Sequence, residues 1–142
     1  MADELRQLVD RIFEVINTGD LGSVEELIHP EYADYSPFGE VFRGPEGFRG
    51  IIGMFRTAFP DLHVTVDDAV VEGDRVAWRS TTTGTHDGEL MGIPPTGRSV
   101  SFEAYNFGRA KDGLAIEHRV LPDMLGLLQQ LGVIPEMAPA TA

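Results

Sequence analysis

Two residues near the C-terminal end of the chain, Asp123 and His118, have side chains suited to acid–base chemistry. Asp123 is flanked by proline and by apolar residues, so a carboxylate at a pocket wall there would be partly desolvated and would hold a proton closer to neutral pH. Such a group takes a proton from an activated carbon and returns it to an oxygen. The alternative is a helix N-cap, whose oxygen accepts backbone N–H groups. The residues alone favour the cap.

His118 lies five positions before Asp123, within a run that is typical of a strand. If its face lines a pocket, the imidazole can polarise a carbonyl or orient Asp123. The alternative is a hydrogen-bonded histidine on an outer sheet face. Strand alternation places Arg119 and Leu121, rather than His118, on the side of Asp123. A bend at the intervening proline would be needed to bring the two together.

Further candidates for a substrate-binding surface are aromatic, sulfur-containing or polar side chains spread along the chain. They are Asp34, Tyr35, Met54, Trp78, His86, Met91, Tyr105 and Arg109.

Each of these residues also has a purely structural interpretation. Trp78 forms either a stacking wall for a flat ligand or part of a subunit interface. Tyr105 and Arg109 steady an enolate or form an exposed ladder with Glu103. Asp34 and Tyr35 contact a ligand at a pocket mouth or make the turn before a proline. His86 either contacts a ligand or anchors a loop through a hydrogen bond. Met54 and Met91 either line the pocket with flexible side chains or fill space in the hydrophobic core.

The composition argues against several kinds of chemistry. The chain has no cysteine, which removes disulfides, thiolate nucleophiles and zinc–thiolate sites. Its four histidines are scattered, without the HxH or HExxH spacing of a metal site. A glycine-rich phosphate loop is also missing, because two prolines interrupt the segment 92–97. We therefore expect no metal.

Charge and hydropathy restrict the possible partners. The chain carries 11 basic and 23 acidic residues, a formal charge of −12, and such a surface repels nucleic-acid phosphates and anionic lipids. No stretch approaches the roughly 20 apolar residues that span a bilayer, and the charged start has no apolar signal region. We expect a cytoplasmic protein that binds a hydrophobic small molecule and neither nucleic acid nor membrane.

Hydrophobic periodicity predicts helices first and strands afterwards. Helical spacing is expected over 3–18, over a shorter segment with a capping box at Ser23 and Glu26, over 44–59 and over 122–131. Residues 31–36, 62–71, 75–86, 99–109 and 114–121 read as extended. This order predicts one α+β domain over 1–132 with a tail over 133–142. Helices packed on a curved, mainly antiparallel sheet would form a cone with an open mouth, where pockets are common.

Several motifs in the chain resemble those of the SnoaL-like polyketide cyclase family. They are 17–20 (NTGD), 29–32 (HPEY), 84–89 (GTHDGE), 92–98 (GIPPTGR), 112–113 (DG), 117–118 (EH), Asp123 and 129–132 (QQLG). The resemblance implies the cone-shaped fold shared with nuclear transport factor two and ketosteroid isomerase, and an activity without metal or organic cofactor. It also favours Asp123 as the acid/base group, with His118 as its partner. The chain departs from the family at Arg119, where an aromatic residue is usual, and at Asp34-Tyr35.

The leading prediction is thus a cofactor-independent cyclase or isomerase that moves protons on a polyketide-like carbonyl compound. Family members that cyclise polyketides close a ring by an intramolecular aldol reaction, although the family also includes hydroxylases. Two alternatives remain open: an epoxide-opening or hydrolytic enzyme, and a non-catalytic binding protein. Because the predicted fold leaves one sheet face without helices, a homodimer through that face is expected as well.

Overall fold

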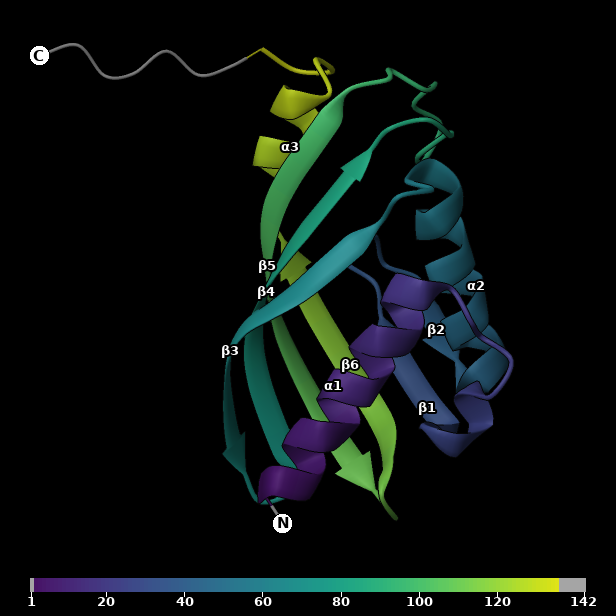
Figure 1. Ribbon diagram of the computed structural model, residues 1–142, viewed down its shortest axis with the longest axis vertical. Coiled ribbons are helices and arrows are strands. Elements are labelled where there is room, and N and C mark those ends of the chain that lie inside the picture. Colours follow the sequence, from purple (N-terminus) through teal and green to yellow (C-terminus); the bar gives the residue numbers. More distant parts are fainter. Residues whose placement is uncertain (1, 136–142) are drawn as a thin grey trace, which may run out of the picture.

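The computed structural model describes residues 2–135 and contains one six-stranded sheet that curves around two helices (Figure 1). The elements follow the order α1 (Ala2–Thr18), a 3₁₀ turn η1 (Val24–Glu26), β1 (Ile28–Tyr35), β2 (Val41–Arg43), α2 (Gly44–Ala58), β3 (His63–Glu72), β4 (Arg75–Thr85), β5 (Ser99–Lys111), β6 (Leu114–Pro122) and α3 (Met124–Gln130). The predicted α+β cone is confirmed.

The strands lie in the order β2-β1-β6-β5-β4-β3. All pairs are antiparallel except β1 with β6, which run parallel with Asp34 opposite His118. Tight turns at Gly73 and Gly113, with φ of 61° and 77°, join β3 to β4 and β5 to β6, and glycine adopts such angles without steric cost. This topology brings the early strand β1 beside the last strand, so distant parts of the sequence meet at the centre of the sheet.

Strand alternation separates an inner and an outer face of the sheet. Along β5 the even-numbered residues from Val100 to Gly108 are buried, whereas the odd-numbered residues from Ser101 to Phe107 are exposed. The inner face packs against the apolar stripes of α1 and α2, which include Leu8, Val9 and Phe48. Figure 1 shows both helices on the same side of the sheet. The core therefore lies inside the cone.

The structure corrects several local predictions. Ser23 makes no side-chain capping bond, and the helix predicted there is only the three-residue turn η1. Pro30 lies inside β1, where the pairing with β6 is irregular between Ile28 and Ala33, and proline is tolerated at such bulges. The short strand β2 lies outside the segments predicted as extended. The predicted start of α2 at Gly44 is confirmed, with proline in its first turn.

In the part of the chain that the structure describes, no helix is long and apolar enough to cross a membrane. Of the predicted tail, residues 136–142 lie outside the described residues.

Candidate active site

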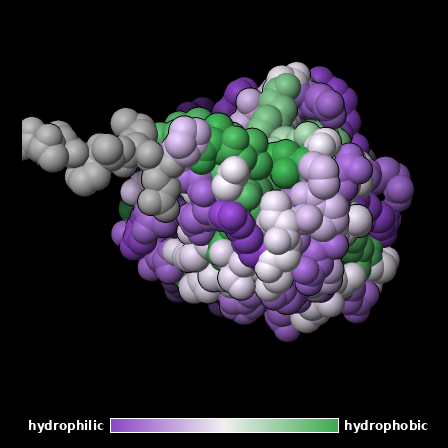
Figure 2. All heavy atoms as spheres, turned by 90° about the horizontal axis from the view of Figure 1, so that it is seen from above, coloured by the Kyte–Doolittle hydropathy of each residue, from purple (hydrophilic) through white to green (hydrophobic). Residues whose placement is uncertain are grey.

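One deep pocket lies between the inner face of the sheet and the helices α1 and α2. Its lining is mostly aliphatic and aromatic, and its side chains come from both helices, from β1, β4, β5 and β6 and from the loop before β5. Three of its apolar residues are more than one third exposed and mark its rim: Phe38, Met54 and Met91. Seen from above, apolar side chains gather among polar ones at the end where α3 and that loop lie (Figure 2). The pocket suits a hydrophobic small molecule.

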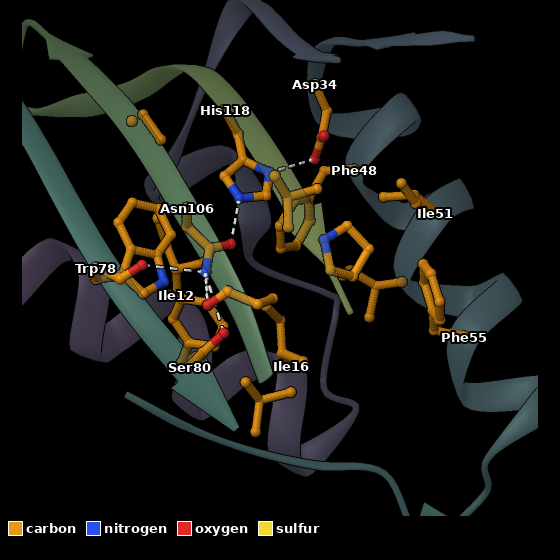
Figure 3. A pocket seen from close by; sticks show the side chains of 18 of the residues that line it. Ile12, Ile16, Asp34, Phe48, Ile51, Phe55, Trp78, Ser80, Asn106 and His118 are labelled. Carbon is orange, nitrogen blue, oxygen red and sulfur yellow. Dashed lines mark hydrogen bonds and ion pairs between the residues drawn. The ribbon is translucent and has the colours of Figure 1, made fainter. Parts of the chain in front are cut away.

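A polar cluster interrupts this apolar lining on the sheet side, made of Tyr32, Asp34, Ser80, Asn106 and His118. The Nδ1 atom of His118 lies 3.1 Å from Oδ2 of Asp34, and its Nε2 lies 3.0 Å from Oδ1 of Asn106. Figure 3 shows Asp34, His118 and Asn106 in a row, facing apolar side chains of α2. The cluster residues come from β1, β4, β5 and β6, and the register of these strands brings the residues side by side.

Hydrogen-bond acceptors around Nδ2 fix the orientation of Asn106. Its Nδ2 group donates to Oγ of Ser80 at 3.0 Å and to the carbonyls of Trp78 and Ala104 at 3.4 Å. Its Oδ1 is therefore the atom that faces His118, and Nε2–H of His118 donates to it. Nδ1 of His118 and Oδ2 of Asp34 are both acceptors when unprotonated, so a hydrogen bond between them requires a proton on one of the two atoms.

Asp34 is the buried carboxyl group of the pocket, with an exposed fraction of 4%. The phenol of Tyr32 donates to its Oδ2 at 2.8 Å. Burial raises the pKa of the Tyr32 phenol well above its usual value, and the neighbouring carboxylate and the hydrogen bond to it raise it further. Tyr32 thus remains a proton donor to Asp34. The second oxygen, Oδ1, is buried without a hydrogen-bond partner in the described structure, so one acceptor position is left open.

Trp78 stacks on His118 and completes the surroundings of the imidazole. The two ring centroids are 5.5 Å apart and the planes differ by 21°. Phe13 of α1 contacts the indole in a T-shaped arrangement at 5.8 Å. The imidazole is consequently held at both nitrogens and on one face.

The structure brings six of the sequence-predicted site residues to this pocket. Asp34, Trp78 and His118 meet in and beside the polar cluster. Met54 and Met91 lie at the rim, where both are partly exposed. Arg109 also lines the pocket, with its Nε 3.5 Å from a carboxylate oxygen of Glu117.

Three other predicted residues lie elsewhere. Tyr35 stacks under the guanidinium of Arg119, whose Cζ is 3.9 Å from the ring centroid, and it does not line the pocket. Tyr105 is 61% exposed on the outer face of β5. His86 is fully buried and accepts a hydrogen bond from the backbone N–H of Thr96, which closes the loop before β5. His86 therefore has the anchoring geometry of its structural interpretation.

The predicted position of Asp123 at the pocket wall is wrong. Its side chain is exposed, and Oδ1 accepts the backbone N–H of Gly126 at 2.9 Å as the N-cap of α3. The reason is strand alternation: the backbone N–H of Asp123 still bonds to Glu103 of β5, so Asp123 continues the outward series of Arg119 and Leu121. No bend at Pro122 turns it inward, and His118 pairs with Asp34 instead.

Sequence reasoning missed Asn106 and the role of Tyr32. Asn106 has a detectable signal, because it is a polar residue in the inward series of β5 among Val100, Phe102 and Ala104. Tyr32 shares a strand face with Asp34, two positions away. Among residues 2–135, no three histidine, aspartate or glutamate side chains are grouped so that they would hold a metal ion.

Comparisons with known proteins agree with this fold and pocket. The family model described as SnoaL-like polyketide cyclase matches residues 6–131. The chain is 36% identical over 128 residues to the aklanonic acid methyl ester cyclase DnrD of Streptomyces peucetius, covering 88% of each chain. It is 34% identical over 120 residues to the nogalonic acid methyl ester cyclase of Streptomyces nogalater, covering 82% of this chain and 88% of that one.

A solved structure extends the likeness to three dimensions. TsrD from Streptomyces laurentii superposes with a TM-score of 0.85 at 36% identity, over 94% of this chain and 98% of that chain. The fold and the apolar pocket define a small α+β protein of the cone-shaped class. Within that class, the chain belongs to the SnoaL-like polyketide cyclase family.

Proposed function

We propose that this protein closes a ring in a neutral, carbonyl-bearing polyketide by acid–base catalysis, with Asp34 as the catalytic carboxylate. The observation that carries the proposal is a buried carboxyl group with one unpartnered oxygen, within the polar cluster of an otherwise apolar pocket. Two relatives named as methyl ester cyclases support the choice of substrate class.

The proposed reaction is an intramolecular aldol addition in which every atom of the substrate is retained. Asp34 takes a proton from a carbon beside a carbonyl group, and the C–H electron pair forms an enolate. The enolate carbon attacks a second carbonyl of the same molecule, which forms the C–C bond and leaves an alkoxide. Asp34 then returns its proton to that oxygen, so the carboxylate is regenerated. A proton between two carbonyls, as in a polyketide chain, is acidic enough for a carboxylate base.

The other members of the polar cluster orient the Asp34 carboxylate and stabilise its negative charge. Tyr32 and His118 both contact Oδ2, so Oδ1, which is buried without a hydrogen-bond partner in the described structure, is the oxygen that we propose contacts substrate. We propose that His118 is an imidazolium, because Nε2–H donates to Asn106 and Nδ1–H then donates to a carboxylate. The positive charge lowers the electrostatic cost of a buried carboxylate and of the enolate. Asn106 holds the imidazole in place and is in turn held by Ser80.

The first test uses aklanonic acid methyl ester, the compound in the name of a relative. The wild-type protein is expected to convert it to a product of unchanged mass. Asp34→Asn keeps the size of the side chain but removes the base, so we expect turnover to fall by about 10²–10⁴-fold. Asp123→Asn is the matched control, because asparagine also caps a helix and the residue lies outside the pocket.

Four results would contradict the proposal. Turnover by Asp34→Asn at the wild-type rate excludes Asp34 as the base. Loss of turnover in Asp123→Asn with an unchanged melting temperature returns the catalytic role to Asp123. Incorporation of ¹⁸O from labelled water into the product identifies hydrolysis, since cyclisation takes up no solvent oxygen. If tight binding of the ester is found without any product in all variants, the protein is a binding module.

We also propose that the outer sheet face joins two copies of this chain into a homodimer. Tyr105, Phe107 and Leu121 are 61%, 38% and 73% exposed on neighbouring strands there, and apolar residues of this kind are typical of interface cores. Arg79, 3.5 Å from Glu103, borders them with opposite charges that match a symmetry-related copy. Sedimentation should give twice the chain mass, and Leu121→Glu should give the single mass. A single mass for the wild type at all concentrations contradicts the dimer.

Two further predictions from the sequence remain proposals, namely a single domain over residues 1–132 and a cytoplasmic location.

A further inference from the structure

We propose that Trp78 is a positioning residue that fixes the ring plane of His118 and favours its protonated form, and that Gly108 is the residue that lets the indole reach it. The inference rests on the proposed function, in which His118 is the cationic partner of Asp34. It is carried by a stacking contact between side chains on two strands that are not neighbours.

Trp78 and His118 lie on β4 and β6, and β5 runs between these strands. In the register, Trp78 is opposite Asn106, and His118 is opposite Gly108. The indole therefore crosses the intervening strand to stack on the imidazole, with the centroids 5.5 Å apart. Side chains on alternate strands are normally separated by the residue between them.

Gly108 leaves the space for this crossing. A Cβ atom built on Gly108 would lie 3.1 Å from Cζ3 and 3.3 Å from Cη2 of Trp78, closer than ordinary carbon contacts. The backbone does not demand glycine here, because Gly108 is not among the glycines with positive φ. The indole also contacts Phe13 of α1 in a T-shaped arrangement. The glycine is thus explained by the position of Trp78.

Stacking acts differently on the two protonation states of His118. The π face of an indole attracts a cation more strongly than any other side-chain ring, and the attraction grows when the pair is shielded from water. Trp78 is 8% exposed. Because Asp34 and Asn106 already bind both nitrogens, the indole adds stabilisation on the face of the ring. The imidazolium, and with it the carboxylate form of Asp34, is favoured.

Other titratable groups around His118 are few among the described residues. On β1 they are Asp34 and, through it, Tyr32. The inner residues of β4 and β5 nearby, Ser80 and Asn106, do not titrate, and α1 and α2 line the pocket with apolar side chains. On β5 and β6, Arg109 and Glu117 also line the pocket, and they pair with each other at 3.5 Å. Glu117 pairs with Arg119 as well, at 3.1 Å. Among these groups, only Asp34 is within hydrogen-bond distance of the His118 ring.

The test is an NMR titration of the histidine ring carbons in the ligand-free protein, with His118 assigned by the His118→Gln variant. Removing the indole in Trp78→Leu takes away the cation–π attraction, so the imidazolium should lose its proton at lower pH. We expect the midpoint of the His118 titration to move down by about 1 pH unit. Trp78→Phe should move it less. Gly108→Ala, which displaces the indole without removing it, should move it in the same direction.

Gly84→Ala is the matched control for Gly108→Ala. A Cβ at this strand position would lie 2.9 Å from Cβ of Phe59, so the substitution causes a similar clash elsewhere in the sheet and should leave the midpoint unchanged. An unchanged or raised midpoint in folded Trp78→Leu and Gly108→Ala overturns the inference. So does an equal shift in Gly84→Ala, because the effect would then report general loosening.

The outcome for this inference is separable from that for the proposed function. The titration needs no substrate, so the midpoint shift is measured even if the ester is not converted. Where the ester is converted, the alkaline limb of the kcat/KM profile should move down with the midpoint, because the active form carries the imidazolium. Conversion that depends on Asp34, together with an unmoved midpoint, retains the proposed function and rejects the role of Trp78.

Discussion

Two aspartates of this chain, Asp34 in the middle of β1 and Asp123 after β6, lie in opposite environments. Asp34 is 4% exposed and is contacted by side chains from its own strand and from β6. Asp123 is exposed and accepts a backbone N–H only three residues ahead. Strand alternation accounts for the difference, since His118 points inward and Asp123 continues the outward series. In a curved sheet, the face of a residue decides its chemistry more than its neighbours in sequence.

The two aspartates also differ in how far away in the sequence their hydrogen-bond partners lie. The partners of Asp34 are assembled by the pairing of β1 with β6 and of β5 with its neighbours. A change to any of them leaves a buried charge short of a partner. Asp123 serves one short helix and is in contact with water. Substitutions around Asp34 should therefore reduce stability more than substitutions at Asp123, and only those around Asp34 should also affect turnover.

His118→Leu should have the largest effect on stability. It removes the imidazole whose Nδ1 lies 3.1 Å from Asp34, so that, with His118 protonated as we propose, the buried carboxylate loses its counter-charge. Loss of one partner of a buried pair lowers the free energy of unfolding by about 3 kcal/mol. Urea denaturation at neutral pH measures the loss. The double variant Asp34→Leu/His118→Leu should recover part of it, because no charge remains to be buried; a double variant less stable than the single one contradicts the buried-pair interpretation.

Tyr32→Phe should have an intermediate effect, because it removes the phenol that donates to Asp34 at 2.8 Å. A hydrogen bond to a charged group contributes about 2 kcal/mol. The raised pKa of Tyr32 adds a pH dependence, since the folded state keeps a proton that an unfolded tyrosine releases around its ordinary pKa of 10.0. The contribution is complete below that pH and is lost as the pH rises above it.

The stability difference between wild type and Tyr32→Phe should accordingly narrow above about pH 10. Urea denaturation at neutral pH and in this alkaline range measures both parts of the prediction. Tyr105→Phe is the control, because Tyr105 is exposed on the outer face and bonds to no buried carboxylate. A difference that stays constant or widens in the alkaline range contradicts the linkage.

Much of the fold could be predicted from the sequence, for reasons visible in particular segments. The apolar stripe of α1, the glycine turns at Gly73 and Gly113 and the alternation of β4 and β5 are local signals, and each element formed close to its predicted bounds. The errors fall where tertiary pairing overrides local preference. The capping box predicted at Ser23 does not form, and only a three-residue turn precedes β1. The strand β2 forms because its backbone pairs with the free edge of β1.

The candidate site was only partly predictable. The sequence indicated Asp34, Trp78 and His118 separately, but their meeting depends on the parallel pairing of β1 with β6, which no local pattern encodes. Asp123 was favoured through the family resemblance and through a bend that the chain does not make. The inward position of Asn106 could have been predicted, because it falls in the alternating series of buried residues along β5. What was missing was the register that aligns such residues across strands.

Asp123→Ala should have the smallest effect, and its smallness completes the comparison of the two aspartates. Loss of an N-cap oxygen lowers stability by about 1 kcal/mol. α3 is also held by Gln130, whose side-chain amide pairs with the backbone of Ser101 in both directions, at 2.8 and 2.9 Å, so the helix should remain docked. Thermal unfolding should show the small loss in Asp123→Ala and almost none in Asp123→Asn, with turnover of the ester unchanged in both. A stability loss in Asp123→Ala as large as that in His118→Leu would mean that the β6–α3 junction, like the polar cluster, depends on long-range partners.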